Sequence, residues 1–217
     1  MKKLTIILVA LSALLGCAKE SLLQLNSEVV SMYSLEEHTI TSNGTNVTFS
    51  SENPYIASVN ETTGLVKAMH IGETYIIVNA DQGSKKVKVT VKAQYHVIKD
   101  PYLKWGCSKE EVIRNVGNPT QNNEDNLIYQ ESLSGHVITG YQFQNGGLYM
   151  AMCAIASGYE TNAVKHIAER YQYWGYSSDM YLFTDSLSLD EYTTIVGITQ
   201  VSGVWTIMYM KNKAVAH

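Results

Sequence analysis

The sequence predicts an all-β sandwich followed by an α+β domain in which helices pack on an antiparallel sheet. Two observations support this prediction. Over residues 22–92, short stretches that suit β-strands are separated by turn residues at intervals of about ten, which is typical of a sandwich. Over residues 93–217, two stretches with helical spacing are each followed by several strand patterns, so we expect two halves, each with a helix on strands.

Residues 1–17 have the composition of an export signal. Two lysines open the sequence, and residues 4–15 form an apolar run that is too short to cross a bilayer comfortably. The run ends in Leu-Leu-Gly-Cys at 14–17, which resembles the lipobox of bacterial lipoproteins. The resemblance implies that Cys17 is lipidated and becomes the new N-terminus, with residues 18–21 as a tether to the membrane. An ordinary secretory signal is the alternative.

The composition limits the classes of partner. The chain has 217 residues and a formal net charge of −4 at pH 7, which suits one or two domains. This mildly acidic balance disfavours a nucleic-acid partner, because nucleic-acid-binding domains carry a basic patch. The 15 tyrosines against three phenylalanines indicate β surfaces that are partly exposed to water.

The strands expected in residues 22–92 end at turn signals such as Asn-Gly at 43–44, Asn-Pro at 53–54 and Thr-Gly at 63–64. In the last strand, valines alternate with lysines. This pattern predicts a half-buried antiparallel strand whose lysines form a solvated edge. The expected strands are residues 22–25, 29–33, 38–41, 47–50, 56–59, 65–68, 74–78 and 86–91.

Four sequence blocks follow one another inside this first unit. They are Phe-Ser-Ser-Glu-Asn at 49–53, Ile-Ala-Ser-Val at 56–59, Gly-Leu-Val-Lys-Ala at 64–68 and Gly-Glu-Thr-Tyr-Ile at 72–76. Their order resembles the bacterial Ig-like domain, group 2, with Phe49 where that family usually has Trp. The resemblance implies an Ig-like sandwich over residues 22–92 that binds or acts as a spacer, and it supplies no catalytic residue.

Residues 93–217 begin with a linker or a first strand and continue into a helix. Ser108 is a good N-cap, Glu111 stands at the capping-box position, and Gly117 ends the helix. A polar loop is expected at 121–126, and the spacing of apolar residues predicts a second helix over residues 161–174. The expected strands are residues 127–130, 137–143, 148–155, 181–183, 192–199 and 204–210.

The first of these helices carries a short motif. Gly106, Ser108, Val112 and the Gly-Asn-Pro at 117–119 resemble a helix of the small outer-membrane lipoproteins of the β-barrel assembly machinery. Their fold is shared with the β-lactamase inhibitor protein, which has two such halves. Residues 141–148 are similar to the hairpin of the same family. The resemblance implies a domain that binds other proteins or cell-envelope components.

The sequence lacks the motifs expected of an enzyme. It contains no Cys-x-x-Cys, His-Glu-x-x-His or Gly-x-Ser-x-Gly motif and no phosphate-binding glycine loop. His166 and Glu169 share a helix face, but two residues do not make a metal site, and we expect a solvated helix surface there. We predict a protein that is not an enzyme, with no catalytic residue, no metal and no cofactor.

Two cysteines fall in the second unit. Cys107 with His96 or His136 as base would suit a nucleophile, but its place at a helix entry disfavours this. A disulfide between Cys107 and Cys153 suits an oxidising compartment. Because residues 150–155 form an apolar run typical of a core, we favour two buried free thiols.

An aromatic run is the strongest candidate for a ligand surface. Aromatic rings stack on sugars and dominate protein hot spots. The alternative is that most of these rings pack between helix and sheet. The candidate ligand-binding residues are Tyr171, Tyr173, Trp174, Tyr176 and Tyr181.

The sequence therefore predicts a lipid-anchored cell-envelope protein that binds a protein or a polysaccharide through residues 93–217. The Ig-like unit serves as spacer or adhesive module. The alternative is a periplasmic envelope-assembly or inhibitor-like structural lipoprotein. No Asp follows Cys17 directly, which favours the outer membrane by enterobacterial sorting rules. Both a periplasmic and a surface-exposed position agree with the sequence.

Overall fold

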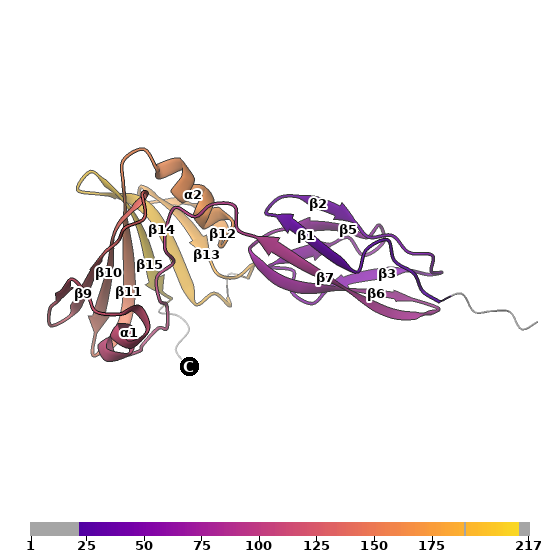
Figure 1. Cartoon of the computed structure of the whole chain (residues 1–217), viewed down its shortest axis with the longest axis horizontal. Coiled ribbons are helices and arrows are strands. Elements are labelled where there is room, and N and C mark those ends of the chain that lie inside the picture. Colours follow the sequence, from indigo (N-terminus) through magenta and orange to yellow (C-terminus); the bar gives the residue numbers. More distant parts are fainter. Residues whose placement is uncertain (1–21, 189, 213–217) are drawn as a thin grey trace, which may run out of the picture.

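The computed structural model describes residues 22–188 and 190–212, so the expected signal, the lipidation site at Cys17 and the tether lie outside the described residues. Two domains lie end to end along the long axis (Figure 1). The first is built of strands, and the second combines helices with one large sheet. The described chain begins at the end of the first domain that points away from the second (Figure 1). The predicted fold class is confirmed.

Seven strands form two sheets in residues 22–92, with the strand orders β1-β7-β6-β3 and β2-β5-β4. β1 runs parallel to β7, and the other pairs are antiparallel. The expected strand at 22–25 is reduced to an isolated bridge between Leu25 and Ser42. The strands are β1 (Val29–Tyr33), β2 (Glu37–Thr39), β3 (Thr48–Ser51), β4 (Ala57–Val59), β5 (Leu65–Ala68), β6 (Gly72–Ala80) and β7 (Gly83–Lys92).

The core of the first domain lies between these two sheets. Val87, Val89 and Val91 of β7 point inward and are fully or almost fully buried. The lysines of the same strand face water, and two of them pair with Glu52 and Glu73 of the neighbouring segments. β7 is an inner strand and not a sheet edge, because β1 adds to its free side.

One eight-stranded sheet forms the centre of the second domain, with the order β12-β13-β14-β15-β11-β10-β9-β8. A helix followed by four strands occurs twice along the chain, and the last strands of the two halves, β11 and β15, pair at the middle of the sheet. The strands are β8 (Gln121–Asn122), β9 (Asn126–Gln130), β10 (His136–Gln144), β11 (Gly147–Ile155), β12 (Gln172–Ser177), β13 (Met180–Thr184), β14 (Thr194–Val201) and β15 (Val204–Lys211).

Helix α1 (Lys109–Val116) begins and ends where the sequence predicts. The Ser108 side chain accepts a hydrogen bond from the Glu111 N–H, and Gly117 at the C-cap has a φ of 105°. The carboxylate of Glu111 does not complete a capping box. It pairs instead with Lys104, whose Nζ lies 2.6 Å away, and with the hydroxyl of Tyr102.

Helix α2 (Glu160–Ala168) is shorter than the predicted helix over 161–174. The chain turns at Glu169, and residues from Gln172 onward form strand β12. Aromatic residues favour strands, and the aromatic residues of β12 lie in a strand that pairs with β13. This pairing outweighs the helical spacing of the apolar residues.

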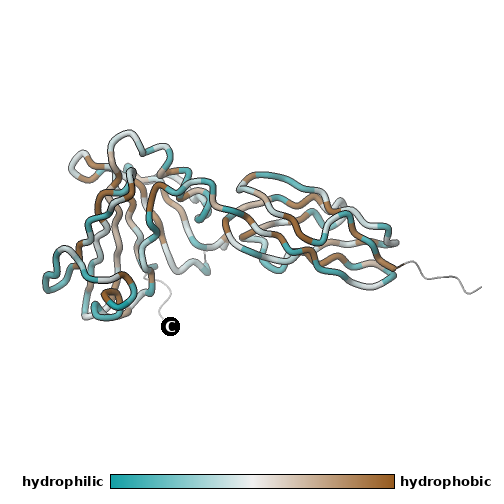
Figure 2. Tube along the Cα trace, in the orientation of Figure 1, coloured by the Kyte–Doolittle hydropathy of each residue, from teal (hydrophilic) through white to brown (hydrophobic). Residues whose placement is uncertain are grey.

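Both helices cover the same face of the sheet (Figure 1). Val112 of α1 and Ala163 and Ile167 of α2 pack on a buried layer that includes Tyr141 and Tyr209. Hydrophobic positions gather in the strands, and hydrophilic positions gather in many of the connecting loops (Figure 2). On the opposite face of the sheet, the described part of the chain places no helix.

Candidate functional site

The helix-free side of the eight-stranded sheet is here called the open face. Side chains alternate between the two faces along a strand, so every second residue of each strand points to this side. Its cross-strand partner points to the same side. The open face is formed by Ile128, Ile138, Gly140, Met150, Met152, Ala154, Leu182, Ile195, Gly197, Thr206, Met208 and Met210. Most of these side chains are half-buried, and the residues between them belong to the core.

Four methionines lie at the centre of the open face. Met150 is the cross-strand partner of Met210, and Met152 is the partner of Met208. A side chain on Gly197, the other partner of Met208, would collide with the Sδ of Met180, so Met180 packs directly on this backbone. Methionine is flexible and polarizable, which makes such a surface adaptable.

A groove of about 730 Å³ opens on this face. Val137 and Ile138 of β10 and Val201 and Val204 at the β14–β15 turn line it, and each of them is at least 39% exposed. Gln142 is among its few polar residues, and it is held by the Tyr149 hydroxyl. The groove has the size and apolar character that ligand sites have in folded proteins.

The candidate aromatic residues divide between three places. Tyr173, Tyr176 and Tyr181 are exposed on the β12–β13 hairpin, and the rings of Tyr176 and Tyr181 lie 5.0 Å apart. They project from the same side of the sheet as the helices, because their cross-strand partners include buried core residues. These three tyrosines form one surface.

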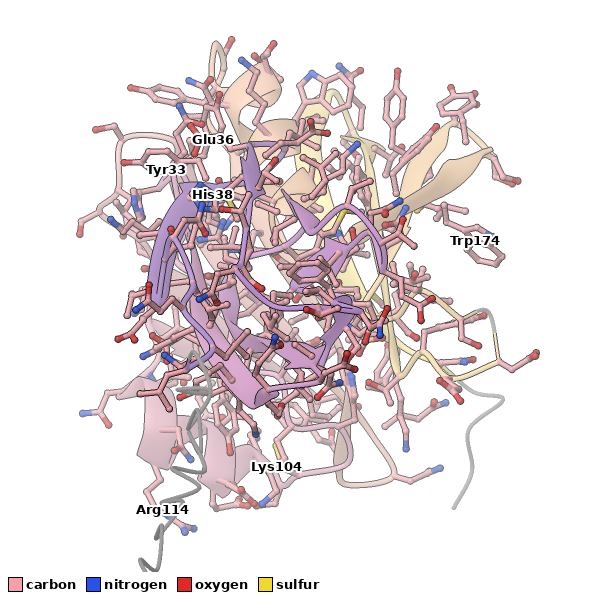
Figure 3. All side chains as sticks on the ribbon, turned by 90° about the vertical axis from the view of Figure 1, so that its right-hand side faces the viewer. Tyr33, Glu36, His38, Lys104, Arg114 and Trp174 are labelled. Carbon is pink, nitrogen blue, oxygen red and sulfur yellow. The ribbon has the colours of Figure 1, made fainter. Side chains whose placement is uncertain are left out.

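Trp174 and Tyr171 are not part of that surface. A bulge in β12 turns Trp174 to the side of Leu182, where its ring lies 5.8 Å from that of Tyr192. It points outward at the edge of the second domain (Figure 3). Tyr171 packs edge-on against the buried Tyr209, with ring centroids 6.1 Å apart, and burial raises its pKa.

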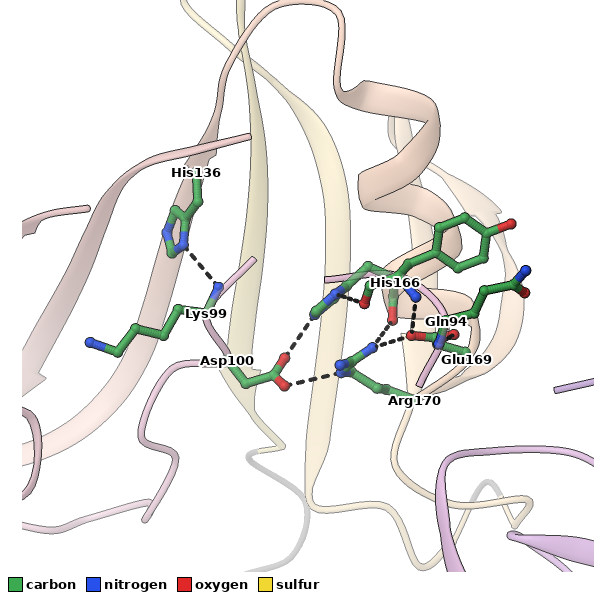
Figure 4. A network of polar contacts seen from close by, with 8 residues as sticks. Gln94, Lys99, Asp100, His136, His166, Glu169 and Arg170 are labelled. Atoms are coloured by element: carbon green, nitrogen blue, oxygen red, sulfur yellow. Dashed lines mark hydrogen bonds and ion pairs between the residues drawn. The ribbon is translucent and has the colours of Figure 1, made fainter. Parts of the chain in front are cut away.

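A polar network holds the segment between the domains against α2 (Figure 4). The carboxylate of Glu169, which is 3% exposed, accepts hydrogen bonds from the backbone N–H groups of Gln94 and Tyr95. Arg170 donates to Glu169 and to Asp100 over 2.7 and 3.0 Å. The side chains of Glu169 and Arg170 are largely buried, and buried charges of this kind are tolerated only when they are paired.

His166 belongs to the same network. Its ring is fully buried, with Nδ1 2.9 Å from the carbonyl oxygen of Tyr95 and Nε2 2.9 Å from Asp100. Burial opposes ionisation of Asp100, but the hydrogen bond from His166 and the charge of Arg170 outweigh it and lower the pKa of this carboxyl. The expectation that His166 and Glu169 form a solvated helix surface is therefore wrong.

The described residues offer little for acid–base chemistry or for a metal held by His, Cys, Asp or Glu. Residues 22–188 and 190–212 contain no cluster of three His, Cys, Asp or Glu side chains able to hold a metal. Cys107 and Cys153 are both buried free thiols, and burial raises the pKa of each. None of the described helices has the length and apolarity needed to span a bilayer.

Comparisons with known proteins identify the first domain. Residues 28–91 match the family model of the bacterial Ig-like domain, group 2. The first domain is a bacterial Ig-like domain of group 2. No curated protein sequence matches the chain.

Two solved structures of the S-layer protein SbsC were also matched. Domains 5–6 align at 12% identity over 90% of this chain and 86% of that chain, with a TM-score of 0.29. Domains 4–9 align at 12% identity over 90% of this chain and 27% of that chain, with a TM-score of 0.28.

Sequence reasoning missed the open face and the polar network. The run at residues 150–155 indicated a core strand, but only Ala151, Cys153 and Ile155 are buried, while the methionines between them face outward. A signal was present: two Met-x-Met segments, at 150–152 and 208–210, lie in strands that are apolar on both sides.

Proposed function

We propose that this chain is a lipid-anchored cell-envelope protein whose second domain binds another protein through the open face. In this proposal, acyl chains on Cys17 hold the chain to the membrane, and the Ig-like domain spaces the second domain from it. The described chain begins at the end of the Ig-like domain remote from the second domain (Figure 1), and this arrangement suits a spacer.

The observation that supports a protein partner is the apolar groove of the open face. Val137, Ile138, Val201 and Val204 are 39% to 47% exposed and line one groove. Exposed apolar side chains that gather on one surface mark sites of interaction more often than scattered ones do. Flexible methionines beside them fit partner side chains of varied shape. A polysaccharide would need more polar groups than this groove offers.

A second candidate function rests on the β12–β13 hairpin. Tyr176 and Tyr181 are 58% and 42% exposed, and the Tyr176 hydroxyl donates to Asp179 over 3.2 Å. An exposed pair of rings beside a carboxylate suits stacking on a sugar. This surface lies on the helix-bearing side of the sheet, so the two candidate functions can be tested separately.

Photo-crosslinking in intact cells tests the protein partner. A photoreactive residue replaces Ile138 or Val204 on the open face, and Arg114 on α1 is the control on the opposite side. We expect a discrete crosslinked product from a photoreactive residue at Ile138 and from one at Val204. The product from Ile138 should disappear when Val204 is replaced by Asp, and the product from Val204 should disappear when Ile138 is replaced by Asp. Equal products from Arg114, or a product insensitive to Asp in the groove, would contradict a role for the open face.

The glycan and assembly alternatives have their own measurements. Retention on immobilised cell-surface polysaccharide that falls in a Tyr176→Ala/Tyr181→Ala variant would favour the hairpin. Identification of an outer-membrane barrel as the crosslinked partner would favour the envelope-assembly role. Protease shaving of whole cells separates a surface-exposed chain, which is released, from a periplasmic one, which is protected.

Fractionation tests the anchor. We expect the wild-type chain in the membrane fraction and a Cys17→Ser variant in the soluble fraction, because stable anchoring needs more than one acyl chain and the variant has none. A Cys17→Ser chain that stays wholly with the membranes would contradict lipid anchoring at this residue.

A further inference from the structure

Two Met-x-Met segments face each other at the centre of the open face. Residues 150–152 lie on β11 and residues 208–210 on β15, and these strands pair antiparallel. The register places Met150 opposite Met210 and Met152 opposite Met208. Directly opposed residues have Cβ atoms about 5 Å apart, so the four side chains start from neighbouring positions on one surface.

The residues between the methionines fix the direction of the four side chains. Ala151 and Tyr209 are fully buried in the core beneath the sheet. The methionines on either side must therefore project to the other side, where they are half-buried and accessible from solvent. Each methionine has three rotatable bonds, so the sulfur atoms of opposed pairs can converge.

A fifth thioether lies beside this group. The Sδ of Met180 packs on the backbone of Gly197, which is the β14 partner of Met208. On the other flank, Met152 lies against Gly140. A Cβ atom added to Gly140 would stand 3.8 Å from the Cε of Met152, which is ordinary contact distance. Glycine on each side leaves room for methionine side chains to lie across the sheet, and Gly197 could not carry a side chain without displacing Met180.

We propose that Met150, Met152, Met208 and Met210, with Met180 beside them, bind a soft monovalent cation, Cu(I) or its analogue Ag(I). Thioether sulfur is a soft and uncharged ligand that selects Cu(I) over hard cations such as Mg²⁺ and Ca²⁺. Neither described thiol competes for the ion at this place, because Cys107 and Cys153 are buried on the other side of the sheet.

The site is independent of the proposed protein partner, although it shares the open face. An adaptable apolar surface needs only the size and flexibility of methionine, whereas a metal site needs its sulfur atoms. Leucine keeps the apolar volume at low cost in stability and removes the sulfur. Methionine-to-leucine variants therefore separate the two roles.

Metal titration of the purified full chain in detergent micelles tests the inference. Cu(I) is titrated without oxygen against a competing chromogenic chelator, and Ag(I) is titrated by calorimetry. The test variant is Met152→Leu/Met208→Leu, which removes the central pair, and the matched control is Met32→Leu/Met69→Leu in the Ig-like domain. Methionine-methyl NMR of the wild type shows which side chains meet the ion.

We expect one more equivalent of bound ion in the wild type and the control than in the test variant. The affinity of the test variant for the ion should fall more than the roughly 10–100-fold that is lost when a residue supporting a metal ligand is mutated. The reason is that this variant loses two of the proposed ligands themselves. The methyl signals of Met150, Met152, Met208 and Met210 should shift, and that of Met32 should not. Equal binding by test variant and wild type, or no binding by the wild type, would overturn the assignment. Cys17 is present in the wild type, the test variant and the control, so it does not contribute to the difference in ion binding between them.

Discussion

The hydroxyl of Tyr55, in the Ig-like domain, lies 2.8 Å from the backbone carbonyl oxygen of Arg170, in the second domain. The same hydroxyl is 3.2 Å from the carbonyl oxygen of Thr184. The Tyr55 ring stacks on His70 with centroids 4.1 Å apart, and the nearby N–H of Ile71 donates to the carbonyl of Glu169. These contacts fix how the two domains sit on each other.

We expect Tyr55→Phe to loosen the domain junction without unfolding either domain. The change removes a hydroxyl hydrogen that two carbonyl groups share, and a hydrogen bond of this kind contributes about 1 kcal/mol. Hydrogen exchange at the Ile71 N–H should become faster, since this group is protected only while the domains stay in contact. Tyr75→Phe, on an exposed ring of β6, is the control. Unchanged exchange at Ile71 in Tyr55→Phe would show that the hydroxyl does not hold the junction.

Loss of the hydroxyl from two buried tyrosines of the second domain should affect the free energy of unfolding differently. The Tyr209 hydroxyl has no hydrogen-bond partner among the described residues, whereas the Tyr141 hydroxyl accepts a hydrogen bond from the Tyr102 N–H over 2.9 Å. A buried unpaired polar group costs about 1–3 kcal/mol. Tyr209→Phe should therefore leave the free energy of unfolding unchanged or raise it, and Tyr141→Phe should lower it. Urea unfolding measures both, and a large loss in Tyr209→Phe would contradict the unpaired state.

The second domain should lose stability as the pH falls below about 6.5, the pKa of histidine in an unfolded chain. Burial lowers the pKa of His136 in the folded state, and its Nδ1 accepts a hydrogen bond from the Lys99 N–H, which a protonated ring cannot do. The unfolded state then binds more protons than the folded state, so the free energy of unfolding falls with decreasing pH until the folded-state pKa is reached. The slope is at most about 1.4 kcal/mol per pH unit for one group.

A His136→Gln variant tests this pH dependence, with the exposed His96→Gln as the control. All three tryptophans, at positions 105, 174 and 205, lie in the second domain, so tryptophan fluorescence follows its unfolding alone. We expect the stability difference between pH 7 and pH 5 to shrink in His136→Gln and to persist in His96→Gln. An unaltered difference in His136→Gln would assign the effect to another group.

The thiols of Cys107 and Cys153 should resist labelling in the folded chain. Both are free and buried, and burial raises the pKa of each thiol, so little reactive thiolate forms. We expect maleimide labelling of these two positions only after unfolding in denaturant, as measured by peptide mass. Labelling of the native chain at Cys107, or recovery of a peptide joined by a disulfide, would contradict this arrangement.

The Ig-like domain could be predicted strand by strand because each strand has one buried face. Val87, Val89 and Val91 alternate with lysines, and this pattern fixes both the strand and its inward side. The pairing of β1 with β7 could not be predicted, because it joins residues far apart in the sequence. The alternation of valine and lysine alone therefore predicts an edge strand, whereas β7 lies between β1 and β6.

In the second domain the errors arose where long-range contacts decide the structure. The helical spacing of Ala163, Ile167 and Tyr171 continues past the end of α2, but pairing of β12 with β13 ends the helix at Ala168. His166 and Glu169 looked like surface residues because the segment that buries them lies about 70 positions earlier in the chain.

The candidate site was predicted only in part for a related reason. The aromatic positions were visible as residue types, but the bulge that separates Trp174 from Tyr173 depends on cross-strand register. The open face was hidden because β11 is apolar on both sides, and periodicity cannot then show which side lacks a covering helix.

The parallel pairing of β1 and β7 has a mechanical consequence. The described chain enters at the far end of the Ig-like domain, and β1 then lies along the half of β7 that runs out toward the second domain (Figure 1). A pull between the two ends of this domain would slide the two strands along each other and load the five register pairs from Val29–Lys88 to Tyr33–Lys92 together. Shear of this kind resists force better than opening one pair at a time, so the domain is built to stay folded under tension.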